Sequence, residues 1–280
     1  MYKILEREIL ADNVVRMEVE APHIANKVQS GQFVIIRVHD TGERFPLTVA
    51  GKDKEKGTIT IIFAAIGKST CELGQLKKGD EILDVVGPLG VASHFDPSIK
   101  KAAVVGGGLG CAIALPQAVH LHEMGVSVDT IAGFRDKDLI ILEPEMKAAS
   151  ENLYIATDNG SAGYHGFVTD VLREQIEKGV KYDIVVAIGP IIMMKNVAEL
   201  TRPYGIKTIV SMNPIMIDGT GMCGCCRLIV GNEVKFACVD GPDFDGHEVD
   251  YDTSMRRLGM YNKLTEREAS CNLLKMAEEA

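Results

Sequence analysis

Four of the seven cysteines lie close together near the end of the chain, between residues 223 and 238. Two residues separate Cys223 from Cys226, and Cys238 follows after a longer gap. An aspartate, Asp218, precedes Cys223 with four residues between them. Plant-type iron–sulfur sites have the spacing C-x4-C-x2-C with a distant fourth cysteine, so only the first ligand differs here. Because carboxylate and thiolate each carry one negative charge, the pattern predicts a [2Fe–2S] cluster held by Asp218, Cys223, Cys226 and Cys238.

The residues alone leave other interpretations of this cysteine cluster open. Cys225 is the alternative ligand if Asp218 is not used. Structural zinc also takes thiolates, but its ligands usually come as two paired knuckles, whereas Cys238 stands alone here. Simple buried thiols are improbable at this density. We therefore favour iron–sulfur over zinc. The loop glycines permit the positive φ values that wrapping a cluster requires; they are Gly219, Gly221 and Gly224.

A glycine run joins an apolar strand-like segment, 102–105, to a helix-like one. Glycine lets the backbone approach a phosphate, and the N-terminus of the next helix supplies free N–H groups and partial positive charge. The strict G-x-G-x-x-G pattern fails, because a cysteine occupies the third glycine position. A turn without a ligand fits this motif equally well, and the βα units that follow favour a nucleotide. The candidate residues are Gly106, Gly107, Gly108 and Gly110.

Three later loops could close over that nucleotide, at 133–135, 157–161 and 189–190. Asp158 follows a strand-like segment and could accept a hydrogen bond from a ribose hydroxyl, although aspartates also cap turns. Gly189 and Pro190 follow another strand-like segment.

A candidate flavin segment lies in the first hundred residues. Arg44 could pair with a pyrophosphate through its planar guanidinium, and Thr48 could offer its hydroxyl to a flavin ring. Pro46 and Leu47 lie between them. A second loop carries small donors suited to phosphate: Gly67, Ser69 and Thr70.

Short strands with regular glycine turns must position the flavin segment, which predicts a small antiparallel barrel or sandwich over residues 1–98. Runs expected to be strands are 14–20, 33–38, 58–64 and 81–86.

From about residue 99 strands alternate with helices, which predicts right-handed crossovers and a parallel sheet over 99–212. Such a sheet offers a ligand crevice at the carboxyl ends of its strands. The remaining residues, 213–280, read as a cysteine-rich loop, a hairpin over 228–238 and a charged helical tail over 253–280. The expected strands are 102–105, 126–132, 153–157, 184–188 and 207–212, and the expected helices 111–124, 143–150, 166–177 and 190–202.

Composition excludes several classes of protein. The formal charge of −9 and the low aromatic content of 5% argue against nucleic-acid binding. Charges interrupt the N-terminal residues, so we expect no signal peptide and a cytoplasmic location. Residues 102–119 carry no charge and reach the length of a membrane span. Their glycines and Pro116 favour strand, turn and helix instead, so we expect no membrane association.

Taken together, these motifs resemble the ferredoxin–NADP reductase superfamily. The order of flavin barrel, nucleotide domain and terminal [2Fe–2S] loop is similar to electron-transfer subunits of dihydroorotate dehydrogenase. The segment from Met212 to Cys226 is more similar still to small (alpha) subunits of electron-bifurcating NADH-dependent reduced ferredoxin:NADP oxidoreductases. The aspartate at 218 is the most specific mark, because the dihydroorotate dehydrogenase branch typically has cysteine there.

The resemblance implies an oxidoreductase subunit with a ferredoxin reductase-like barrel and α/β fold. FAD would lie on the segment 44–48 and the loop 67–70, NAD(H) on the glycine turn, and the cluster on the four ligands. Ile113 departs from the proline often found there. A larger subunit with a second FAD, [4Fe–4S] clusters and the NADP site would be the partner, and ferredoxin would be reached through it. The alternatives are a dihydroorotate dehydrogenase subunit and a non-catalytic zinc-containing assembly subunit.

Overall fold

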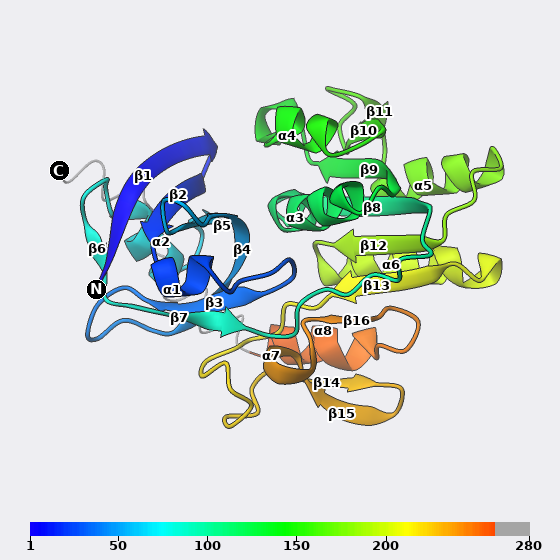
Figure 1. The fold of residues 1–280 in the computed structure, drawn as a ribbon. Coiled ribbons are helices and arrows are strands. Elements are labelled where there is room, and N and C mark those ends of the chain that lie inside the picture. The colour runs from blue at the N-terminus through cyan, green and yellow to red at the C-terminus, as the bar shows by residue number, and fades with distance from the viewer. Residues whose placement is uncertain (261–280) are drawn as a thin grey trace.

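The computed structural model describes residues 1–260. Figure 1 shows a barrel-like sheet, a second sheet covered by helices, and a small C-terminal part that lies beside both. No helix within the described range has the length and apolar character needed to cross a membrane. Residues 102–119 form strand, glycine turn and helix, as preferred from the sequence. The predicted tail over 253–280 lies largely outside the described residues.

The first sheet has seven strands in the order β6-β1-β2-β5-β4-β3-β7, and all its pairs are antiparallel. It confirms the predicted antiparallel barrel. The strand expected over 81–86 is in fact two short strands. The break lies at Leu83, whose N–H donates a hydrogen bond to the Val38 carbonyl. The elements are β1 (Tyr2–Ala11), β2 (Val14–Glu20), α1 (Pro22–Ala25), β3 (Phe33–Arg37), β4 (Phe45–Asp53), β5 (Thr58–Ala64), α2 (Lys68–Gln75), β6 (Glu81–Ile82) and β7 (Asp84–Leu89).

Strand β4 changes partners along its length. Residues 45–48 pair with β3, whereas residues 49–53 pair with β5. Proline lacks an N–H and is confined in sheets to positions where that donor is not needed. Pro46 fits because the edge of β4 away from β3 carries no β5 partner there. That edge of the predicted flavin segment is therefore open.

The second sheet has the order β11-β10-β9-β8-β12-β13-β16, parallel throughout except for β16. The chain order reverses between β8 and β12, which is where open α/β sheets bind ligands. All five residues of β12 are buried, as a parallel strand covered on both faces requires. The elements are β8 (Lys101–Gly107), α3 (Gly110–Glu123), β9 (Ser127–Phe134), η1 (Lys137–Leu139), α4 (Glu143–Ala148), β10 (Asn152–Thr157), β11 (Tyr164–His165), α5 (Val168–Glu177), β12 (Ile184–Ile188), α6 (Ile191–Thr201), η2 (Arg202–Tyr204) and β13 (Lys207–Ser211).

The C-terminal part extends this second sheet. Its hairpin ends at Phe236, earlier than expected, because the chain turns there into a short helix that contains Cys238. A strand not predicted from the sequence, β16, adds to the sheet edge. Ile35 of the barrel, Cys226 and Cys238 belong to one buried apolar cluster, so this part packs against the barrel as well. The elements are β14 (Arg227–Val230), β15 (Glu233–Phe236), α7 (Ala237–Asp240), β16 (Asp243–Asp245) and α8 (Tyr251–Gly259).

Candidate functional site

The predicted cluster ligands lie on two segments that the C-terminal part brings together. Residues 212–226, here called the cluster loop, connect β13 to β14, and Cys238 lies in α7. The Sγ atoms of Cys226 and Cys238 are 3.3 Å apart, and both residues are buried. Cys223 is exposed. The fold thus joins a thiol from each side of the hairpin, although they are separated in sequence.

Asp218 holds the first half of the cluster loop. One carboxylate oxygen accepts hydrogen bonds from the N–H and the hydroxyl of Thr220, and the other accepts from the Cys223 N–H at 2.7 Å. Hydrogen bonds from Cys223, and then from Thr220, hold the pKa of Asp218 below its usual range. The carboxylate is therefore anionic and directly beside Cys223.

The surroundings of Cys238 and Cys225 raise the pKa of both thiols. Burial, and then the Cys226 thiol, raise the pKa of Cys238 to about 12. Burial and the nearby Cys223 raise the pKa of Cys225. Cys225 thus lies within reach of the same cluster of thiols, so the structure leaves it as the alternative ligand.

Glycines shape the cluster loop as expected from the sequence. Gly219, Gly221 and Gly224 all have positive φ values, of +81°, +88° and +66°. A Cβ atom on Gly219 would lie 2.7 Å from Leu89 and 3.0 Å from Ile35, so this glycine also permits close contact with the barrel.

The same loop contacts the predicted flavin segment. Arg44 donates from Nε to the Ile217 carbonyl at 3.0 Å and from Nη2 to the Asp218 carbonyl at 3.4 Å. Pro46, Leu47 and Thr48 follow on β4 and are half-buried. The flavin segment and the cluster loop are therefore neighbours, which their separation in sequence did not reveal.

The second predicted flavin loop forms the N-terminus of α2. Thr70 uses its hydroxyl locally, since it accepts from the Gly67 N–H at 3.0 Å. Ser69 donates to the Glu43 carboxylate at 2.7 Å, which places this helix start beside the residue preceding Arg44. Arg44 and the 67–70 turn thus occupy one region of the barrel.

The nucleotide candidates all lie at one edge of the second sheet, because parallel strands end on the same side. Gly106 and Gly107 end β8, Asp158 follows β10 and is exposed, and Gly189 and Pro190 follow β12. The glycine turn and the Gly189 loop flank the point where strand order reverses.

Close packing at this edge requires glycine. A Cβ on Gly110 would lie 2.3 Å from the Ile188 carbonyl oxygen, so α3 begins directly against β12. Gly108 has φ +55° with open space around it. Cys111 is fully buried, and burial raises its pKa to about 12. It therefore acts as a packing residue of this edge.

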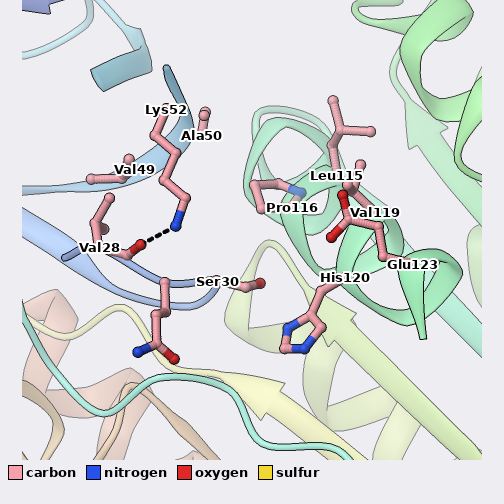
Figure 2. Close-up of a pocket in the computed structure, with 12 residues that line it drawn as sticks. Val28, Ser30, Val49, Ala50, Lys52, Leu115, Pro116, Val119, His120 and Glu123 are labelled. Atoms are coloured by element: carbon pink, nitrogen blue, oxygen red, sulfur yellow. Dashed lines mark hydrogen bonds between the residues drawn. The ribbon is translucent and has the colours of Figure 1, made fainter. Parts of the chain in front are cut away.

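A groove of about 540 Å³, which no sequence motif indicated, lies between the barrel and α3. Figure 2 shows the barrel side and the helix side of this groove facing one another, with a hydrogen bond from Lys52 to the Val28 carbonyl on the barrel side. Its polar lining groups are Gln29, Ser30, Lys52, His120 and Glu123, and it includes none of the predicted cofactor residues.

The donor set fits an iron–sulfur cluster. Three thiols and one anionic carboxylate lie on or beside a loop of glycines and backbone N–H groups, and these are the kinds of ligand and hydrogen-bond donor that such clusters use. In residues 1–260, no three His, Cys, Asp or Glu side chains surround a single metal-ion position.

Comparisons with known proteins agree with this site. Residues 213–250 match the model for the iron–sulfur cluster binding domain of dihydroorotate dehydrogenase B. The chain is 44% identical over 261 residues to a dihydroorotate dehydrogenase B (NAD(+)) electron transfer subunit homolog of Thermotoga maritima, covering 93% of this chain and 92% of that protein. It is 50% identical over 268 residues to an uncharacterized protein of Clostridium beijerinckii encoded in the adh 3′ region, covering 93% and 90%.

A solved structure of an NADH-dependent reduced ferredoxin–NADP oxidoreductase, studied for flavin-based electron bifurcation, superposes with a TM-score of 0.91. It is 41% identical, with 96% of this chain and 97% of that chain covered. The match to an iron–sulfur domain favours that interpretation over zinc. The comparisons confirm the ferredoxin reductase-like fold and the predicted cofactors FAD, [2Fe–2S] and NAD(H). The chain therefore belongs to the family of dihydroorotate dehydrogenase B-type electron-transfer subunits, in the ferredoxin reductase superfamily.

Proposed function

We propose that this subunit oxidises NADH at FAD and passes the electrons singly through [2Fe–2S] to a larger FAD and [4Fe–4S] subunit, within an electron-bifurcating NADH-dependent reduced ferredoxin:NADP oxidoreductase. The observation that carries the proposal is the contact between Arg44 of the flavin segment and the Ile217 carbonyl of the cluster loop. It makes the two proposed cofactor-binding segments neighbours.

When bound, FAD takes up a hydride and gives electrons singly, and the cluster accepts one electron at a time. The protein's own residues position the FAD. Arg44 presents donors for the FAD pyrophosphate, and the start of α2, at Gly67, Ser69 and Thr70, adds a helix N-terminus. The open edge of β4 at Pro46, Leu47 and Thr48 presents backbone groups to the flavin ring. Thr48 is the residue we assign to the reacting edge of the ring.

The nucleotide lies at the strand-order reversal in this proposal. Gly106, Gly107, Gly108 and Gly110 form the turn from β8 into α3, which brings the N-terminus of that helix to its pyrophosphate. Gly189 and Pro190 close the other side, because a Cβ on Gly189 would lie 3.1 Å from the Gly107 nitrogen. Asp158 accepts from a ribose hydroxyl.

The cluster ligands in this proposal are Asp218, Cys223, Cys226 and Cys238. The chain divides accordingly into an FAD barrel over 1–98, an NAD-binding part over 99–212 and a cluster-binding part over 213–280. Cys226 and Cys238 are buried and Cys223 is exposed, so a cluster held by them would be accessible from the outside at Cys223, where a partner subunit could receive electrons.

A second candidate is the electron-transfer subunit of a dihydroorotate dehydrogenase, which the names of the matching family model and relatives favour. The two differ in the large partner. Asp218 favours the bifurcating complex. Affinity purification of the tagged subunit from its native source tests this choice. Recovery with an iron–sulfur flavoprotein that binds NADP supports the proposal, whereas recovery with a dihydroorotate-oxidising partner overturns it.

A further inference from the structure

Helix α8 presents one arginine to the cluster loop. Arg257 donates from Nη2 to the Cys225 carbonyl at 3.2 Å and is half-buried. The next residue back, Arg256, is exposed and donates to Thr253 of its own helix at 2.9 Å. Neighbouring arginines on one helix therefore have different surroundings, and only Arg257 contacts the loop.

The start of α8 is anchored by contacts with neighbouring segments. Asp250 caps the helix by accepting from the Thr253 N–H at 2.9 Å, and its own N–H donates to the Ile229 carbonyl of β14. Tyr251 is buried and donates its hydroxyl to the Gly246 carbonyl at 2.9 Å. These contacts tie the helix start to the hairpin that follows the loop (Figure 1), so Arg257 is held beside Cys225.

The positive charge of Arg257 links this contact to the reduction of the cluster. Each of the four proposed ligands carries one negative charge, so reduction adds an electron to a region that is already anionic. A nearby fixed cation stabilises the reduced state more than the oxidised state, and such outer groups tune cluster potentials. Arg257 is a cation under any ordinary condition of pH.

We propose that Arg257 is a positioning residue that holds the second half of the cluster loop through the Cys225 carbonyl and raises the reduction potential of the cluster. The inference rests on the proposed function, because it requires the [2Fe–2S] cluster. It assigns a role to α8 that neither the sequence motifs nor the family match contains.

The test compares Arg257→Gln with its matched control, Arg256→Gln, and with Arg257→Lys. Each protein is loaded with iron and sulfide without oxygen, its iron content is measured, and its cluster is titrated by EPR against potential. For Arg257→Gln we expect the equilibrium constant for reduction to fall about tenfold, which is about 59 mV more negative for one electron. Arg257→Lys retains most of the potential, and Arg256→Gln leaves it unchanged.

A wild-type potential in Arg257→Gln at full cluster content overturns the inference, and so does an equal shift in Arg256→Gln. If Arg257→Gln does not take up iron, the potential of Arg257→Lys tests the inference instead. A near-wild-type potential in Arg257→Lys supports the role of the positive charge. A tenfold lower equilibrium constant for reduction in Arg257→Lys contradicts it. Failure of the wild-type protein to hold any cluster contradicts the proposed function instead, so the two failures are distinguishable.

Discussion

The guanidinium of Arg44, the residue before β4 of the barrel, donates to the main-chain carbonyl of Ile217, 3.0 Å away in the cluster loop. The two residues are separated by most of the nucleotide-binding sheet in sequence. Gly219 reinforces this contact, since its missing Cβ allows the loop to lie on Ile35 and Leu89. This contact links the flavin segment directly to the loop that carries the proposed cluster ligands.

Replacing Arg44 with glutamine should therefore affect both cofactors. We expect FAD affinity to fall at least tenfold, because a charged donor to the pyrophosphate is lost. Amide hydrogen exchange in the cluster loop should also accelerate, because the loop loses two hydrogen bonds. Fluorescence of released FAD and exchange mass spectrometry measure these effects. Arg37→Gln is the control, because Arg37 also lies in the barrel but pairs with Asp84. Unaltered exchange in the loop of Arg44→Gln would show that the contact is dispensable.

Changes at Asp218 should distinguish it from Cys225 as a ligand. Asp218→Ala should lose most of its iron, because it removes both the carboxylate and the acceptor for the Thr220 and Cys223 N–H groups. Asp218→Cys should keep a cluster with an altered EPR spectrum and potential. Cys225→Ser should keep the wild-type spectrum. Iron analysis and EPR provide the readout. Cluster loss in Cys225→Ser, with an unchanged spectrum in Asp218→Cys, would assign the ligand to Cys225.

Gly110→Ala should destabilise the protein and abolish NADH binding. The new Cβ would lie 2.3 Å from the Ile188 carbonyl oxygen, so the start of α3 must move away from β12. We expect a loss of about 1–3 kcal/mol in the free energy of unfolding, measured in urea. Gly125→Ala, beyond the C-terminal end of α3 and outside the proposed nucleotide site, is the matched control. It meets no atom within 4 Å and suffers only from its positive φ, a cost of about 1–2 kcal/mol. If Gly110→Ala binds NADH with full affinity, the glycine turn is not part of the nucleotide site.

A buried acid, Asp243, should make stability depend on pH. One carboxylate oxygen accepts from Ser93 at 2.5 Å and from Gln117 at 3.2 Å, and the other has no partner within the described structure. Gln117 in turn accepts from Ser30, so this network joins the barrel, α3 and β16 beside the groove of Figure 2. Burial raises the pKa of Asp243, although hydrogen bonds oppose the change.

Since the folded protein favours protonated Asp243, its contribution to stability is complete below the ordinary pKa of about 3.9 and declines as pH rises through the folded value. Asp243→Asn lacks this decline. The free energy of unfolding of the variant should therefore improve relative to the wild type as pH is raised from about 4 towards neutrality. Urea unfolding at a series of pH values measures the difference. Parallel curves for the two proteins would contradict it.

Local sequence patterns predicted most of the sheet and loop elements for physical reasons. Apolar and polar residues alternate in 14–20, as in a strand with one buried face, and the run 184–188 is apolar throughout, as in a strand buried on both faces. Both segments are strands, as expected. The spacing of Asp218, Cys223 and Cys226 places them in a single loop regardless of the rest of the fold. Positive φ at the loop glycines follows from the same local constraint.

What the sequence did not reveal depends on contacts between distant segments. Arg44 and Ile217 meet because β13 ends beside the barrel, and no local pattern encodes that approach. The change of partner along β4 depends on two neighbouring strands at once. The role of Arg257 also required the position of α8, since Arg256 and Arg257 look alike in sequence. Strand β16 is only three residues long and carries no periodic signal.

The most direct test of the account is to mix the purified, cofactor-loaded subunit with NADH in the absence of oxygen and freeze it for EPR. NADH should bleach the flavin absorbance, and the rhombic signal of a reduced [2Fe–2S] cluster should follow. The Cys226→Ser variant should show flavin bleaching without that signal. The contradicting result is a wild-type protein whose flavin is reduced, at a potential low enough to reduce the cluster as well, but which shows no cluster signal. That result would exclude an electron path from the flavin segment to the cluster loop.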